Sequence, residues 1–151
     1  MKINVCIIEK KTQDDFSKLV ENYKKMIRKY AQIEEISLFN KKITLAQNRD
    51  AIIAKESYSE AFKPYTSGYN IALDPSAKEM DSFEFSEIFA NIHILNFFIA
   101  GAYGFEDRFL RKCDKVISLS QLTLSHKIAK IVLYEQIFRG LSIQNNHPYH
   151  K

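Results

Sequence analysis

Residues 92–100 read IHILNFFIA, an almost uninterrupted apolar run, and Gly101-Ala102-Tyr103-Gly104 follows at once. A short run that is apolar at successive positions is typical of a strand in the centre of a parallel sheet, where helices cover both faces. Glycines then allow the chain to turn sharply. The sequence therefore predicts a central strand over 92–100 and a loop over 101–104.

The segments on either side alternate between strand-like and helix-like patterns. Short runs rich in β-branched residues predict strands, and capped amphipathic stretches between them predict helices. The further predicted strands are 2–8, 33–39, 69–73 and 115–119, and the predicted helices are 12–31, 44–62, 82–91, 106–111 and 125–143. This alternation indicates an α/β fold: one domain over residues 1–151, with a mostly parallel sheet and helices on both faces.

The composition is that of an ordinary globular protein, with 46% hydrophobic and 26% charged residues. The formal net charge of +4 permits an RNA partner without demanding one. Cys6 and Cys113 are expected to be free thiols in apolar surroundings, and no Cys/His spacing predicts a metal site. No apolar segment is long enough to span a membrane, so we expect a cytoplasmic protein without a membrane partner.

Ligands of open parallel sheets bind beyond the carboxyl ends of the strands, which here directs attention to the loops after Leu73, Ala100 and Leu119. The loop 120–125 mixes aliphatic and hydroxyl side chains and contains no basic residue, so it suits a neutral adenine better than a phosphate. Capping of the last helix is the plainer role for Ser125. Neither a dinucleotide fingerprint nor a phosphate loop occurs, which counts against a flavodoxin-like nucleotide binder.

The last predicted helix carries His126 and Lys130, then Glu135 and Arg139, each pair four residues apart and therefore on one face. Without other information, this pattern indicates a solvated face with one ion pair. The tail 145–151 contains two histidines, a tyrosine and a lysine, which could stack on a base or contact phosphate. A frayed end is the plainer interpretation of such a tail.

Several motifs of the C-terminal half, in order, resemble the ribosomal large-subunit methyltransferase H family, the smallest members of the SPOUT class. The motifs are Leu73-Asp74, Phe98–Gly104, Ser118–Ser120, Leu122–His126, Glu135–Arg139 and Asn146–Lys151. The resemblance implies a C-terminal trefoil knot, a homodimer and S-adenosyl-L-methionine as cofactor. It further implies methylation of N3 of a pseudouridine in 23S rRNA, on assembled ribosomes.

The resemblance also assigns site residues. The cofactor-binding residues that it implies are Leu73, Gly101, Ser120, Gln121, Leu122, Thr123, Leu124 and Ser125. The residues that it places near the RNA base are His126, Lys130, Arg139, Tyr149 and His150. In this family the tail of one subunit is expected to complete the site of the other. Lys130 stands where the family frequently has Arg, which keeps the charge and removes the bidentate geometry.

An imide nitrogen must lose its proton before or during methyl transfer. Histidine titrates nearest neutrality, so His150 or His126 is the expected base. Alternatively, Lys130 or Arg139 stabilises the imide anion directly. Two other functions stay open at this point: a related methyltransferase with another rRNA target, and a non-enzymatic ribosome-binding factor with the same fold.

Overall fold

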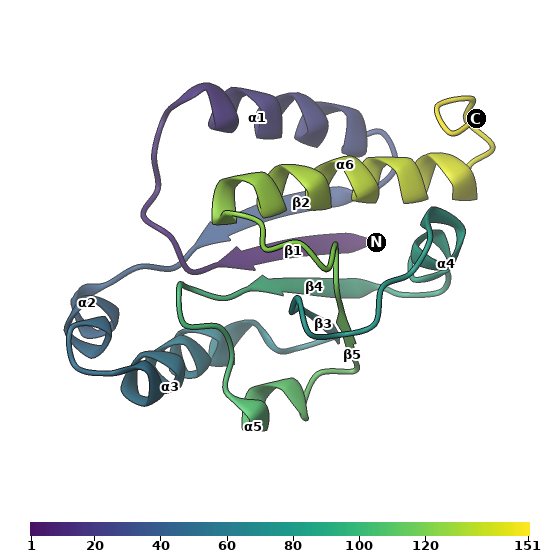
Figure 1. Ribbon diagram of the computed structural model, residues 1–151. Helices are drawn as coiled ribbons and strands as arrows, with labels where there is room; N and C mark the ends of the chain where they lie inside the picture. The colour runs from purple at the N-terminus through teal and green to yellow at the C-terminus, as the bar shows by residue number, and fades with distance from the viewer.

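Five parallel strands in the order β2-β1-β4-β3-β5 form the central sheet of the computed structural model, which describes residues 1–151 (Figure 1). The strands are β1 (Lys2–Ile7), β2 (Gln32–Ser37), β3 (Tyr69–Leu73), β4 (Ile94–Ile99) and β5 (Lys115–Ile117). β4 pairs with β1 on one side and β3 on the other, and all of its residues after Ile94 are buried. The predicted central strand is confirmed, with slightly narrower bounds.

Helices cover both faces of the sheet, as predicted (Figure 1). One face carries α1 (Asp15–Ile27), α4 (Ser82–Glu87) and α6 (His126–Gln144); the other carries α2 (Lys41–Gln47), α3 (Ala51–Phe62), the 3-10 turn η1 (Lys63–Tyr65) and α5 (Asp107–Leu110). Two hydrophobic cores result, because side chains of a strand alternate between faces. Ile3, Val5 and Ile7 of β1 belong to the core under α1 and α6, whereas Cys6 belongs to the core under α3.

Three asparagines form a polar ladder across the middle strands β1, β4 and β3. Asn96 of β4 lies in register with Asn4 of β1 and with Asn70 of β3. Asn4 Nδ2 donates to Asn96 Oδ1 at 2.8 Å, and Asn96 Nδ2 donates to Asn70 Oδ1 at 3.0 Å. A shift of register by one residue would leave these buried amides unpaired, so the ladder favours one register.

The helix predicted over 44–62 is wrong, because two helices occupy that stretch. The side chain of Asn40 caps α2 by accepting from the Ile43 N–H, and Asp50 caps α3 by accepting from the Ile53 N–H. Thr44 lies inside α2 and donates to the Asn40 carbonyl. Ser125 does cap α6, as predicted, by accepting from the Ile128 N–H.

The loops after β3 and β5 run alongside each other. Glu79 forms an isolated parallel bridge with Ser118, and the Ser118 N–H donates to the Lys78 carbonyl at 3.1 Å. The C-terminal trefoil knot that the resemblance implies stays a prediction. None of the helices is both long and apolar enough to cross a membrane.

Candidate cofactor pocket and C-terminal cluster

A pocket opens where the loops after β3, β4 and β5 meet the first turn of α6. Its empty space is about 750 Å³ including the open mouth, within the range of small-molecule pockets. Six of the residues that the resemblance assigns to the cofactor line it: Leu73, Gly101, Ser120, Leu122, Thr123 and Leu124. Gln121 and Ser125 belong to the same loop but are not part of the lining.

The wall of the pocket is mostly apolar, and its charged side chains include a carboxylate but no lysine or arginine. That carboxylate belongs to Asp74. Asp74 Oδ1 accepts from the backbone N–H of Ser76 at 2.9 Å and from its hydroxyl at 2.6 Å, which stabilises the turn at 74–76. Asp74 was not predicted as a site residue, although it follows Leu73 in a motif of the resemblance. A wall of this kind suits a neutral or cationic ligand better than a phosphate.

Gly101 is required by a close contact beneath the pocket floor. A Cβ atom at this position would lie 2.5 Å from both Cζ and Oη of Tyr58, a fully buried side chain of α3. Gly104 closes the turn by donating its N–H to the Gly101 carbonyl at 3.0 Å, with a φ of 78°. Burial raises the pKa of the Tyr58 phenol, whose hydroxyl has no hydrogen-bond partner.

His126 lines the pocket from the first turn of α6, but Lys130 lies elsewhere. The Lys130 ammonium forms ion pairs with Glu9, after β1, and with Glu35 of β2, and only 8% of its side chain is exposed. Tyr134, one turn further, donates its hydroxyl to Glu35 at 3.1 Å. Burial, followed by the nearby Glu35 carboxylate, raises the pKa of Tyr134 well above its ordinary value.

The far end of α6 and the tail form a second group, the C-terminal cluster, made of Glu135, Arg139, Tyr149 and His150. Arg139 Nε and the Tyr149 hydroxyl both donate to Glu135 Oε1, at 3.0 and 3.1 Å. The Arg139 guanidinium lies 4.7 Å from the Tyr149 ring centre and 3.3 Å from His150 Nδ1. Burial and the bond to Glu135 raise the pKa of Tyr149 to about 12. The predicted Glu135–Arg139 ion pair is confirmed.

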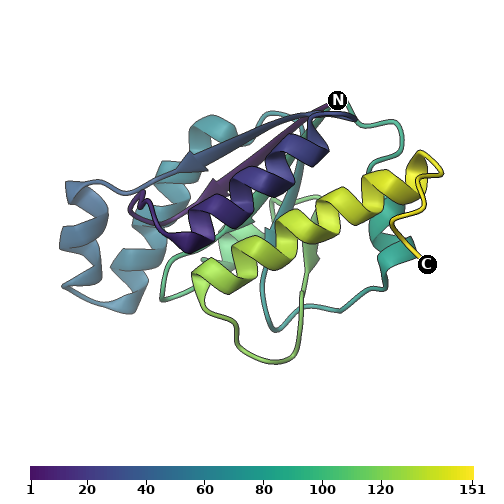
Figure 2. The same ribbon diagram turned by 90° about the horizontal axis from the view of Figure 1, so that it is seen from above.

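One chain does not bring the pocket and the C-terminal cluster together. His126 lies in the first turn of α6 and Arg139 near its last turns, so at 1.5 Å per residue they are about 20 Å apart. Figure 2 shows α6 as one continuous helix with the tail at the end opposite the pocket loops. The structure therefore groups Arg139, Tyr149 and His150, and separates them from His126 and Lys130.

The fold and the motifs agree with those of known proteins. The family described as "Predicted SPOUT methyltransferase" matches residues 1–150. The chain belongs to the SPOUT methyltransferase family. A solved member of a methylase family, "The structure of a probable methylase family protein from Haemophilus influenzae Rd KW20", has the same fold: its TM-score is 0.59 at 15% identity, over 99% of this chain and 70% of that one.

Relatives within this SPOUT family match over their whole length. A protein of Sulfurovum sp. (strain NBC37-1) is 53% identical over 153 residues, and one of Aliarcobacter butzleri (strain RM4018) is 51% identical over 151 residues; each match covers 100% of both chains. Both relatives are named "Ribosomal RNA large subunit methyltransferase H". The resemblance inferred from the C-terminal motifs is thus confirmed, and it extends through the N-terminal half.

Proposed function

We propose that the chain transfers a methyl group from S-adenosyl-L-methionine to large-subunit ribosomal RNA, at N3 of a pseudouridine in the 23S rRNA of assembled ribosomes. The names of the full-length relatives support the reaction class and the kind of RNA. The pocket at the carboxyl ends of β3, β4 and β5 supports the cofactor, and it is the observation on which the proposal depends.

The residues of the pocket fit S-adenosyl-L-methionine in both shape and charge. Leu73, Leu122 and Leu124 supply apolar surface for an adenine ring, and Ser120 and Thr123 supply hydroxyl groups. The Asp74 carboxylate supplies negative charge in a lining without lysine or arginine, which favours a cationic sulfonium over a nucleotide phosphate. Gln121 and Ser125 contribute as members of the same loop, with Ser125 holding the start of α6.

The bound cofactor supplies an electrophilic methyl group, so the protein must deliver a deprotonated nitrogen in line with it. A guanidinium can only donate hydrogen bonds, so the Arg139–His150 contact makes His150 Nδ1 the acceptor and leaves the proton on Nε2. His150 held in this way donates rather than accepts at its free nitrogen. His126 in the pocket wall is therefore the better general base, and Arg139 the cation that stabilises the imide anion.

A homodimer reconciles the two separated groups of residues. In a two-fold dimer, pairing of the α6 helices in antiparallel directions places the C-terminal cluster of one subunit beside the pocket of the other. Apolar side chains near the start of α6 are available for such an interface: Leu19, Leu122 and Ile128 are all exposed. Other residues of the helix, such as Phe138 and Leu141, are buried in the subunit's own core.

A methyl-transfer assay tests the proposal. The protein is incubated with radiolabelled S-adenosyl-L-methionine and either intact ribosomes or free rRNA, from a strain that lacks the corresponding gene. We expect label in the 23S rRNA of ribosomes, and N3-methylpseudouridine in nuclease digests examined by mass spectrometry. Label in another nucleoside indicates the other rRNA target, and binding to ribosomes without transfer indicates a non-enzymatic ribosome-binding factor.

A further inference from the structure

Basic residues crowd the end of α1, and Glu21 is the acidic residue nearest to them. Residues 22–33 include Lys24, Lys25, Arg28 and Lys29 and contain no aspartate or glutamate. Lys24 pairs with Glu21 at 2.6 Å, whereas Lys25, Arg28 and Lys29 are exposed and form no ion pair. These last three residues, called here the α1 basic face, are three and four positions apart and therefore share one side of the helix end.

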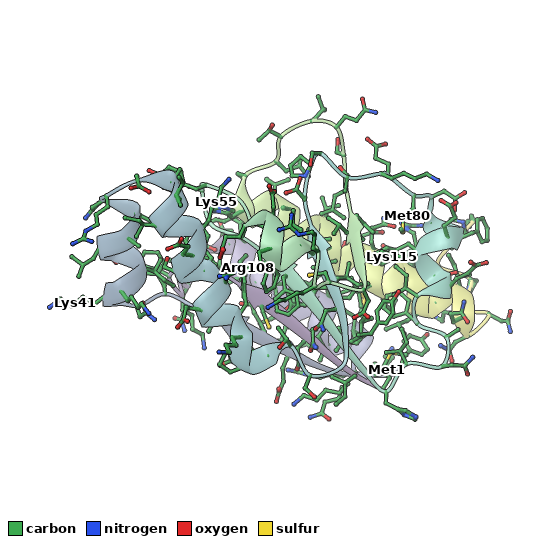
Figure 3. All side chains as sticks on the ribbon, turned by 90° about the horizontal axis from the view of Figure 1, so that it is seen from below. Met1, Lys41, Lys55, Met80, Arg108 and Lys115 are labelled. Carbon is green, nitrogen blue, oxygen red and sulfur yellow. The ribbon has the colours of Figure 1, made fainter.

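The helix macrodipole explains only part of this arrangement. A cation in the last turn interacts favourably with the helix C-terminus, but three unpaired cations on one side repel each other. On the opposite face of the domain, acidic residues lie among the cations. Residues 106–115 hold Arg108, Arg111, Lys112 and Lys115 together with Glu106, Asp107 and Asp114 (Figure 3). The α1 basic face thus holds three exposed cations without an ion pair, in a chain whose net charge is only +4.

The α1 basic face lies at the same end of the molecule as the C-terminal cluster. α1 and α6 run side by side in the same direction, so both helices end near the tail (Figures 1 and 2). The ring of Tyr30 is centred 6.4 Å from both Phe138 and His147, and Phe138 is centred 4.7 Å from Tyr149. A row of aromatic rings therefore connects the basic face with the cluster that contains Arg139.

We propose that the α1 basic face, extended by the exposed His147 and Lys151 of the tail, docks the sugar–phosphate backbone of the RNA next to the methylated base. The inference rests on the proposed function and adds the surface that positions its substrate. Phosphate contacts from lysine and arginine set the register of a nucleic acid, and aromatic rings accept unstacked bases beside them. The C-terminal cluster then receives the base while the basic face holds the flanking strand.

Two matched triple variants test this surface. The first, Lys25→Gln/Arg28→Gln/Lys29→Gln, removes the basic face; the second, Lys63→Gln/Arg111→Gln/Lys112→Gln, removes two exposed lysines and one arginine from the opposite face. Each variant loses three positive charges from exposed positions. The dissociation constant for ribosomes is measured between about 50 and 200 mM salt, the range in which counterion release is pronounced. Affinity for S-adenosyl-L-methionine and the melting temperature are measured alongside.

We expect the first variant to reduce the slope of log affinity against log salt by about 2, since each phosphate contact on single-stranded RNA contributes about 0.7. The second variant should keep the slope of the unmodified protein, and both should bind S-adenosyl-L-methionine normally. Equal slopes in the two variants overturn the docking surface, whether both fall or neither does. If the first variant melts at a lower temperature, single Arg28→Gln and Lys29→Gln variants replace it, each with a slope lower by about 0.7.

Failure of the docking surface and failure of the proposed function give different results. Unimpaired methyl transfer with the same KM for ribosomes in both triple variants overturns the docking surface alone. The opposite result combines two observations: the first variant alone loses salt-dependent binding, and the unmodified protein transfers no methyl group. This result upholds the docking surface and rejects the proposed function. Competition by polyglutamate as strong as by RNA would point to an acidic protein partner and overturn RNA as the occupant.

Discussion

Lys130 forms an ion pair with Glu9 that is almost wholly removed from water, with side-chain exposures of 8% and 13%. Glu35 of β2 shares the same ammonium at 3.4 Å, so one cation compensates two carboxylates, one within β2 and one just after β1. The pair joins α6 to β1 and β2 close to the start of the helix that carries His126. Lys130 is therefore best described as a positioning residue.

Replacement of Lys130 by Met should lower the free energy of unfolding by about 3 kcal/mol, because Glu9 and Glu35 would face each other without a cation. Urea unfolding followed by circular dichroism measures the loss. Lys127→Met is the matched control: its ion pair with Asp14 is more exposed, at 42% of the lysine side chain, and should contribute much less to stability. Equal losses in the two variants would contradict the assignment.

Gly101→Ala should reduce affinity for S-adenosyl-L-methionine at least about tenfold, because overpacking against the buried Tyr58 ring displaces the pocket loop. Gly104→Ala provides the contrast, since its added Cβ meets no atom within 4 Å and only its φ of 78° is unfavourable. That variant should lose about 1 kcal/mol of stability and little affinity. Calorimetric titration and thermal melting separate the two effects, and unaltered affinity in the Gly101 variant would refute the steric argument.

His126→Ala and His150→Ala should change different kinetic constants of the methyl transfer. Loss of a general base lowers kcat by about a hundredfold or more, so His126→Ala should abolish most turnover with cofactor affinity retained. His150→Ala should raise the KM for ribosomes more than it lowers kcat, because its ring contacts Arg139 and Phe83 rather than the pocket. Single-turnover methyl transfer measures both quantities. The reverse pattern would make His150 the base.

Mixing two inactive proteins should restore activity if subunits share sites. A Gly101→Ala protein has an impaired pocket and an Arg139→Ala protein an impaired C-terminal cluster, so each homodimer should be nearly inactive at cofactor concentrations well below the raised dissociation constant. After unfolding and refolding together, half of the dimers are mixed, and each contains one intact composite site, so about a quarter of full activity should return. Sedimentation velocity checks for dimers. Absence of any recovery, with mixed dimers present, would argue that each subunit acts alone.

Asp14→Asn should make stability less sensitive to acid. The hydrogen bond from Lys127, followed by the cap bond from the Ser17 N–H, lowers the pKa of Asp14 from 3.8 to about 2. Because the folded-state pKa is the lower one, the ionised carboxylate stabilises the fold above about pH 4, and this contribution disappears as the pH falls through 2. Asparagine still caps α1. The melting-temperature difference between the two proteins should therefore shrink from pH 7 to pH 2, and parallel curves would contradict this.

Local patterns predicted most of the elements, and failed where two local signals competed or where the deciding partner is distant in sequence. The apolar run at 92–100 and the cap at Ser125 are local signals, and the structure confirms them. The break between α2 and α3 was also signalled locally, by Asn40 and Asp50, but the continuous apolar spacing concealed it.

The candidate site shows the same division. The Glu135–Arg139 pair could be predicted because its members are four residues apart on one helix. The burial of Lys130 could not, since its partners Glu9 and Glu35 are 121 and 95 positions away in sequence. Likewise, only the folded tail shows that Tyr149 returns to Glu135, 14 positions earlier. The order of strands in the sheet brings the three pocket loops together, and no single segment of the sequence predicts that order.

The cofactor pocket draws its wall from Leu73 at one extreme and Ala129 at the other, so more than four-fifths of the chain must be synthesised before the wall exists. An emerging nascent chain, or a fragment that ends before α6, thus lacks the pocket that we propose for the methyl donor. A donor that binds only the finished fold, at concentrations above its dissociation constant, shifts the folding equilibrium toward completion. Occupancy by the donor accordingly distinguishes mature enzyme from every partly folded precursor.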